Sequence, residues 1–222
     1  MRILYVISGL GLGGAEKQLV GLAKQLDYRG HEVAIYTLTT RVQRQAELAD
    51  SGVKLVVHQK RIKFDPTVLW RLRRMMREWR PDVIHGFLFD GDFYSRLASF
   101  GSAVPVRNSE RNDGYRLSWH QRLVHRLTRG IARGVVANTF AGKQFVQRLF
   151  GLPSTGVHVV WNGIQPEELE RQAASSINYR HEFFGDDQNI RIACLVGAIK
   201  PQKNYHLALD SAARLIAIDP AW

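Results

Sequence analysis

Residues 1–22 read MRILYVISGLGLGGAEKQLVGL and carry the strongest structural signal in the chain. A short apolar run, Ile3–Ile7, is followed at once by glycines and then by an amphipathic helix pattern. The glycines are Gly9, Gly11, Gly13 and Gly14. A strand, a glycine-rich turn and a helix together present backbone N–H groups and a helix N-terminus to an anion, commonly a phosphate. The sequence therefore predicts an α/β protein that binds a phosphorylated molecule.

Composition is that of an ordinary globular protein, with 222 residues of which 45% are hydrophobic and 23% charged. The single cysteine, Cys194, excludes a disulfide within the chain and fits a reducing compartment. It lies in the apolar run 192–196, so we expect it to be buried in a strand. No apolar run approaches the roughly 20 residues of a membrane span. The run after Arg2 is too short for a signal peptide, so we expect a cytoplasmic protein.

The formal net charge of +11 suggests an anionic partner, either nucleic acid, a membrane surface or a phosphate-bearing substrate. Arginines recur at helical spacing in two segments; they are Arg71, Arg73, Arg74, Arg77 and Arg80, then Arg122, Arg126, Arg129 and Arg133. No nucleic-acid-binding motif accompanies them, so nucleic acid is not expected. The alternatives are a solvated basic surface and peripheral association with the inner face of an anionic membrane.

Apolar runs alternate with helical patterns, which favours a Rossmann-like, mostly parallel sheet with helices on both faces. The predicted strands are 2–8, 32–38, 53–57, 82–85, 104–107, 134–138 and 157–161. The predicted helices are 15–28, 66–80, 91–100, 115–131 and 140–149, with a weaker one at 41–51. The chain is predicted to be an α/β protein.

The alternation breaks near residue 165, which divides the chain into a first domain at 1–165 and a polar linker at 166–190. A strand-like run at 191–197 and a helix pattern after it begin a second α/β domain, 191–222. One strand and one helix cannot bury their own apolar faces. We therefore expect a truncated second domain, belonging to a longer protein or docked on the first domain or on another chain.

The glycines also match G-x-G-x-x-G, with Gly9, Gly11 and Gly14 in the three places, which is the pattern of a dinucleotide-binding fold. The second strand ends without the acidic residue that holds the ribose of NAD, although Arg41 offers a cation for the 2′-phosphate of NADP. An NADP-binding oxidoreductase is therefore an alternative, weakened because no tyrosine has a lysine four residues after it.

Five blocks in order along the chain resemble the family 4 retaining glycosyltransferases, which have the GT-B fold. The blocks are GGAE at 13–16, PDVIH at 81–85, GVVANT at 134–139, VVWNGI at 159–164 and VGAIKPQKN at 196–204. The resemblance implies an acceptor-binding N-terminal domain and a donor-binding C-terminal domain with the active site between them. It further implies metal-independent transfer of a hexose from a UDP- or GDP-sugar to a glycan or lipid-linked acceptor, in cell-envelope polysaccharide synthesis, without a cofactor.

The resemblance also implies roles for individual residues. Gly13, Gly14, Gly197 and Lys203 would bind the donor and its phosphates. The acceptor or cleft residues would be Glu16, Asn138, Asn162 and Gly163. His85 is expected to end a strand at the carboxyl edge of the sheet. Asn108 and Glu110 are expected in the loop after the fifth strand, where the family carries a histidine; with His85 they are the catalytic candidates.

Two departures from the family pattern bear on activity. The family's arginine before the lysine loop is Ala198 here, which removes one phosphate contact. The family's donor-binding Glu-x7-Glu element would lie beyond Trp222. A non-catalytic or split acceptor-binding subunit, completed by a partner that supplies the donor domain, is therefore the main alternative.

Overall fold

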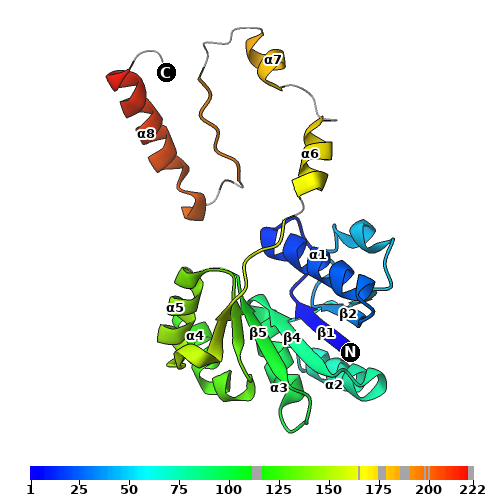
Figure 1. The fold of residues 1–222 in the computed structure, drawn as a ribbon. Helices are drawn as coiled ribbons and strands as arrows, with labels where there is room; N and C mark the ends of the chain where they lie inside the picture. Colours follow the sequence, from blue (N-terminus) through cyan, green and yellow to red (C-terminus); the bar gives the residue numbers. More distant parts are fainter. Residues whose placement is uncertain are drawn as a thin grey trace. The chain divides into compact units, whose positions relative to one another are not determined.

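The structure is a computed structural model that describes residues 1–111, 117–164, 166–174, 179–185, 191–197, 199 and 201–219. The chain forms two compact units, Met1–Ile164 and Gln165–Trp222 (Figure 1). Each unit is described by itself. Ala198, whose identity departs from the family pattern, lies outside the described residues.

The first unit is built on a seven-stranded sheet in which every neighbouring pair is parallel. Its strands are β1 (Arg2–Ile7), β2 (Glu32–Thr37), β3 (Lys54–Val57), β4 (Val83–Phe87), β5 (Val106–Glu110), β6 (Val135–Ala137) and β7 (Val157–Val159). The order across the sheet is β3-β2-β1-β4-β5-β6-β7. All seven predicted strands are present, and the predicted Rossmann-like α/β class is confirmed.

Helices cover both faces of this sheet (Figure 1). They are α1 (Gly14–Tyr28), α2 (Pro66–Trp79), α3 (Leu88–Ser99), α4 (Trp119–Thr128) and α5 (Phe140–Phe150). Alternate residues of β1 point to opposite faces, so Tyr5 packs with Leu19 of α1 whereas Leu4 packs with Leu72 of α2. A third cluster joins α5 to β6 and β7. The core is thus two apolar layers separated by the sheet.

Three predicted elements differ from the structure. The segment 41–51 forms only a short 3₁₀ helix, Gln45–Leu48, in which Leu48 alone is buried, too little apolar surface to hold a longer helix. The fourth helix begins at Trp119 instead of 115, and residues 112–116 lie outside the described part. The third begins at Leu88, because the chain passes from β4 into α3 without a loop, through a left-handed φ of 63° at Leu88.

The second unit contains α6 (Pro166–Ala174), α7 (Tyr179–Phe184), a 3₁₀ turn (Pro201–Lys203) and α8 (Tyr205–Ile218). The predicted strand at 191–197 is wrong, because this segment forms no strand. Cys194 is accordingly exposed instead of buried. The physical reason is that the described residues of this unit offer no second strand with which to pair.

The junction of β4 and α3 is the tightest backbone packing in the first unit. A Cβ added at Gly91 would collide with the carbonyl oxygen of Val6 in β1, so the first turn of α3 lies directly on the sheet. A Cβ at Gly86 would lie 2.7 Å from the Cα of Asp92. Glycine at these two places lets α3 approach β1 and β4 closely enough to bring Asp92 against β5.

We predict that Gly91→Ala lowers the free energy of unfolding by about 1–3 kcal/mol, because the added methyl group meets backbone that cannot move aside. Urea denaturation followed by circular dichroism measures the change. Gly21→Ala in α1 is the matched control, since nothing lies within 4 Å of its added Cβ. It should stabilise the protein by up to about 1 kcal/mol. Equal effects of the two substitutions would contradict the prediction.

Candidate active site at the carboxyl edge of the sheet

The carboxyl ends of the strands meet at one edge, and the chain changes direction there between β1 and β4. From β1 the chain continues to β2 on one side, whereas β4 continues to β5 on the other. Such a switch point leaves a crevice outside the carboxyl ends of the strands, where α/β proteins bind ligands. The glycine-rich loop follows β1, and the sharp turn into α3 follows β4. The site is therefore built from residues at this edge.

The side chain of Glu16 folds back over the start of α1. Gly13 is the N-cap of α1, and a Cβ there would collide with the Glu16 carboxylate. A negative group is stabilised at a helix N-terminus by the helix dipole. Gly14 is exposed, with nothing within 4 Å of an added Cβ. A ligand phosphate that approaches Gly13 must therefore displace the carboxylate of Glu16, whereas Gly14 is open.

The glycine loop is held in place by the segment after β2. Leu10 donates its N–H to the carbonyl oxygen of Arg41 over 2.7 Å. The Nε of Arg44 donates to the carbonyl oxygen of Gly11 over 3.1 Å, and its guanidinium pairs with Glu47. Sequence reasoning did not identify Arg44. The loop is therefore ordered by its own contacts without any ligand.

The loop after β7 is fastened to α1. The side chain of Gln18 donates to the carbonyl oxygen of Gly163 over 2.9 Å and accepts from its N–H over 3.0 Å. Arg111 donates from Nη1 to the Oδ1 of Asn162 over 3.0 Å. Asn162 and Gly163, both predicted cleft residues, thus lie at the edge that carries Glu16. Gln18 and Arg111 were missed by sequence reasoning.

Arg111 brings a cation into this edge. It follows β5 directly, and its guanidinium carbon lies 4.8 Å from the ring centre of Phe87. Desolvation lowers the pKa of Arg111, and the phenol of Tyr5 nearby opposes this shift. Its Nε is buried without a hydrogen-bond partner. A desolvated guanidinium with an unused donor is suited to binding a phosphate or carboxylate. Arg111 could have been identified from the sequence by its position directly after a predicted parallel strand.

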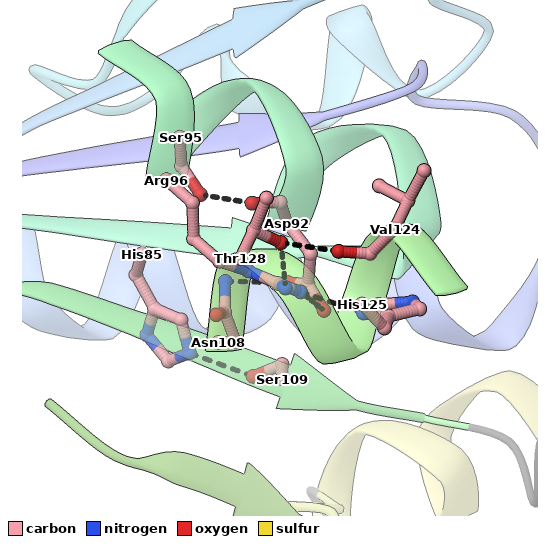
Figure 2. A network of polar contacts seen from close by, with 9 residues as sticks. All are labelled: His85, Asp92, Ser95, Arg96, Asn108, Ser109, Val124, His125 and Thr128. Atoms are coloured by element: carbon pink, nitrogen blue, oxygen red, sulfur yellow. Dashed lines mark hydrogen bonds and ion pairs between the residues drawn. The ribbon is translucent and has the colours of Figure 1, made fainter. Parts of the chain in front are cut away.

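His85 lies inside β4 and does not end it. The strand continues to Phe87, so the predicted position of His85 at the strand end is wrong. Its Nε2 is 2.7 Å from the Oγ of Ser109 (Figure 2). The centre of its ring lies 5.5 Å from that of Tyr5. Burial lowers the pKa of His85 to about 3, and the positive charge of Arg111 acts in the same direction. The imidazole is therefore neutral near pH 7 and acts as a hydrogen-bonding group.

Asn108 and Glu110 belong to β5, which runs to residue 110, instead of the loop that was expected. The Nδ2 of Asn108 donates to the Oδ1 of Asp92 over 2.9 Å, and Asn108 is buried (Figure 2). Glu110 is the last residue of the strand and is partly buried at the carboxyl edge. Of these two candidates, Glu110 is the one that reaches the edge.

A buried polar network lies beneath the site, and sequence reasoning missed it (Figure 2). Arg96 of α3 is only 1% exposed; its Nη2 is 3.6 Å from the Oδ2 of Asp92 and 2.8 Å from the Nδ1 of His125. Its Nη1 donates to the Oγ1 of Thr128 over 2.8 Å. Burial raises the pKa of Asp92 and lowers that of His125 to about 3. The network joins α3, α4 and, through Asn108, β5.

The remaining predicted residues lie in two places. Asn138 follows β6 directly and precedes Thr139, whose side chain caps α5 by accepting from Gly142 N–H. In the second unit the side chain of Lys203 lies against Gly197, whose added Cβ would be 3.4 Å from the lysine Cδ. Tyr205 donates its hydroxyl to the carbonyl oxygen of Gly197 over 2.5 Å. Gly197 and Lys203 are thus brought together within their own unit.

The described part of the chain contains no group of three or more His, Cys, Asp or Glu side chains that could hold a metal ion. None of its helices combines the length and the apolar character that a membrane crossing requires.

Comparison with known proteins decides the family. Residues 12–168 match the family model for glycosyltransferase family 4. The chain belongs to this family. No curated protein sequence matches the chain. Membership in family 4 leaves the NADP alternative without support.

Solved structures share the GT-B fold with this family 4 chain at low sequence identity. HepE from Anabaena, in complex with UDP and glucose, is 18% identical with a TM-score of 0.71, covering 96% of this chain and 58% of its own. The lipopolysaccharide outer core galactosyltransferase WaaB, in its apo form, is 15% identical with a TM-score of 0.60. This match covers 74% of the present chain and 46% of WaaB. UDP-N-acetylglucosamine 2-epimerase from Rickettsia bellii is 12% identical with a TM-score of 0.55. This match covers 82% of the present chain and 50% of the epimerase. The chain spans about half the length of these proteins.

We predict that Gln18→Leu increases hydrogen exchange at the Gly163 amide about fivefold or more, because a neutral hydrogen bond contributes about 1 kcal/mol. Gln25→Leu, on an exposed position of the same helix, is the control and should leave this amide unchanged. Exchange at Gly163 that is the same in both variants would show that Gln18 does not hold the loop.

Proposed function

We propose that this chain is the acceptor-binding domain, with the beginning of the donor-binding domain, of a retaining, metal-independent hexosyltransferase. The proposed reaction transfers a hexose from a UDP- or GDP-sugar to a glycan or lipid-linked acceptor of the cell envelope. The observation that carries the proposal is the family 4 match over residues 12–168. The complex of HepE with UDP and glucose supports a UDP-linked donor.

The proposed roles follow the geometry of each unit. Lys203 and Gly197 bind the donor diphosphate, and Lys203 offsets the charge that develops when the nucleotide leaves. At the sheet edge of the first unit, Gly13 and Gly14 offer backbone N–H groups to a phosphate or sugar oxygen, while Arg111 and Asn162 bind polar groups of a substrate. Neutral His85 contributes a hydrogen bond, Glu110 supplies a carboxylate at the end of β5, and Asn108 positions this strand through Asp92.

A split enzyme is the second candidate. In the second unit, Leu207 and Leu209 of α8 are exposed, as are Ile192 and Leu195 in the segment 191–197. Exposed apolar side chains in this number mark a surface that another part of a protein covers. A longer chain or a partner subunit that carries the rest of the donor domain supplies such a cover equally well.

We predict that the natural-length protein, whose intact mass is measured first, releases UDP or GDP from a nucleotide-sugar when acceptor extract is present. The rate should not change with EDTA, and the product should keep the donor's anomeric configuration by NMR. Lys203→Ala should lower kcat more than about tenfold through lost phosphate stabilisation.

Lys203→Arg should restore part of the rate, because the positive charge is kept, and Lys54→Ala on an exposed position of β3 is the control. Loss of the rate in EDTA, or unchanged kinetics of Lys203→Ala, would contradict the mechanism. Activity that requires a second polypeptide would establish the split enzyme.

We also propose that the protein associates from the cytoplasm with the inner face of an anionic membrane, through one face of α4. Trp119, Leu123 and Leu127, spaced four residues apart, are 76%, 47% and 76% exposed. Arg122 and Arg126 lie beside them, exposed on the same helix. An apolar stripe with flanking cations is suited to the interface of an anionic bilayer, where each cation contributes roughly 1 kcal/mol.

The other basic helix is less suited to this role. Arg73 of α2 donates to the carbonyl oxygens of Leu97, Ala98 and Phe100 at the end of α3. Arg74 is paired with Glu78. Part of the charge on α2 therefore serves the fold itself, which leaves α4 as the stronger candidate.

We predict that replacing Trp119, Leu123 and Leu127 with serine reduces sedimentation with phosphatidylglycerol vesicles at least about tenfold, since the inserted apolar area is lost. High salt should weaken binding of the unaltered protein. Tyr28→Ser is the control, because Tyr28 is 87% exposed at the end of α1, outside α4. Vesicle binding that survives the triple substitution would exclude α4 as the contact.

A further inference from the structure

A cavity lies at the amino ends of β6 and β7, at the edge of the sheet opposite the candidate active site. Its volume is about 170 Å³, and its lining includes Gly134 and Gly156, which precede the two strands. Among the other lining residues are the arginines Arg96, Arg129 and Arg133, the buried Asn108, and apolar residues that include Val135, Phe150 and Pro153. The cavity lies at the amino edge of the sheet, whereas the candidate active site lies at the carboxyl edge. Asn108 and Arg96, which line the cavity, belong to the buried network beneath that site.

The charge in this cavity is incompletely compensated. Arg96 is 1% exposed, yet its Nε has no hydrogen-bond partner. Its nearest carboxylate, Asp92, is 3.6 Å away, and burial raises the pKa of that carboxyl, which weakens it as a counterion. The side chains of Arg129 and Arg133 are exposed at the rim, and neither has a hydrogen-bond or ion-pair partner among the described residues. A buried donor left unpaired is costly, and it marks a place for a missing acceptor.

The apolar residues that line the cavity indicate that its ligand has an apolar part as well as an anionic group. Val135 and Phe150 are buried side chains of the third core cluster, and Pro153 adds a further apolar surface. A bare inorganic ion would leave this apolar surface in contact with water. The combination of cations and apolar walls is suited to an anionic head joined to a small apolar body.

The geometry points to a binding site for a phosphate monoester with an apolar substituent, held by Arg129 and Arg133 at the rim and by Arg96 within. Guanidinium groups bind phosphate oxygens by paired, charge-assisted hydrogen bonds. Two sources offer this chemistry, a soluble phosphate monoester and the headgroup of a phosphatidic acid. The second source is relevant because Arg129 directly follows α4, the proposed membrane contact.

Isothermal titration calorimetry of the chain with phenyl phosphate tests the site. We expect one saturable site, with inorganic phosphate at least about tenfold weaker because it lacks the apolar body. The double variant Arg129→Gln/Arg133→Gln should weaken phenyl phosphate binding about tenfold or more. The matched control is Arg122→Gln/Arg126→Gln, which removes the same charge from α4 outside the cavity lining and should change affinity less than about twofold.

The proposal is overturned by the absence of saturable binding, by equal affinity for inorganic phosphate, or by equal losses in both double variants, which would indicate only a diffuse positive surface. The four arginines are exposed, so the variants should keep the circular dichroism of the unaltered protein. Because no glycosyl transfer is measured, failure of the proposed function leaves this test unaffected.

Vesicles distinguish the two sources of the ligand. If the natural ligand is a lipid, phosphatidic acid vesicles, which carry a monoester, should bind more tightly than phosphatidylglycerol vesicles. The Arg129→Gln/Arg133→Gln variant should lose that preference. Equal binding to both vesicles, together with calorimetric binding of phenyl phosphate, assigns the site to a soluble monoester.

Discussion

The close approach of α3 to the sheet is the constraint on which most of the first unit depends. Gly91 lies against the carbonyl oxygen of Val6, and Gly86 lies against Asp92 at the beginning of the second turn of the helix. No other residue type leaves room for this approach. It allows β4 to pass into α3 without a loop, and it fixes where the next turn of the helix places its polar side chains.

Those side chains connect the core to the candidate site. Asp92 receives a hydrogen bond from Asn108 in β5, and Arg96, one helical turn later, reaches His125 and Thr128 on α4. Buried polar groups at this depth are tolerated only when they are paired. The pairing therefore fixes β5 relative to α3, and so determines where Glu110 and Arg111 meet the carboxyl edge. The Nε of Arg96 is the exception, because it is buried without a hydrogen-bond partner in a residue that lines the cavity.

The sequence was sufficient for the fold but only partly for the site. Alternating apolar runs and helix patterns predicted the seven strands of the first unit, because central strands such as β1 and β2 are buried between helices and carry a nearly continuous apolar signal. The same apolar pattern predicted a strand wrongly at 191–197, where an equally apolar run has no neighbouring strand among the described residues of its unit. The positions of His85 and Asn108 were misjudged because strand ends are set by pairing, which periodicity does not report. Arg111, Gln18 and the Arg96 network depend on contacts between residues far apart in sequence, which no local pattern reveals.

The folded-back side chain of Glu16 has a consequence for selectivity among anions. A carboxylate tethered three residues from the helix N-cap competes with any incoming anion as an intramolecular ligand, at an effective concentration on the order of millimolar. Chloride and small carboxylates, which carry a single charge, gain little by replacing it. A diphosphate, with more charge and more acceptor atoms, gains more than it displaces. Under the proposed function, the Glu16 carboxylate therefore disfavours monoanions at the glycine loop relative to a polyanionic group of the donor.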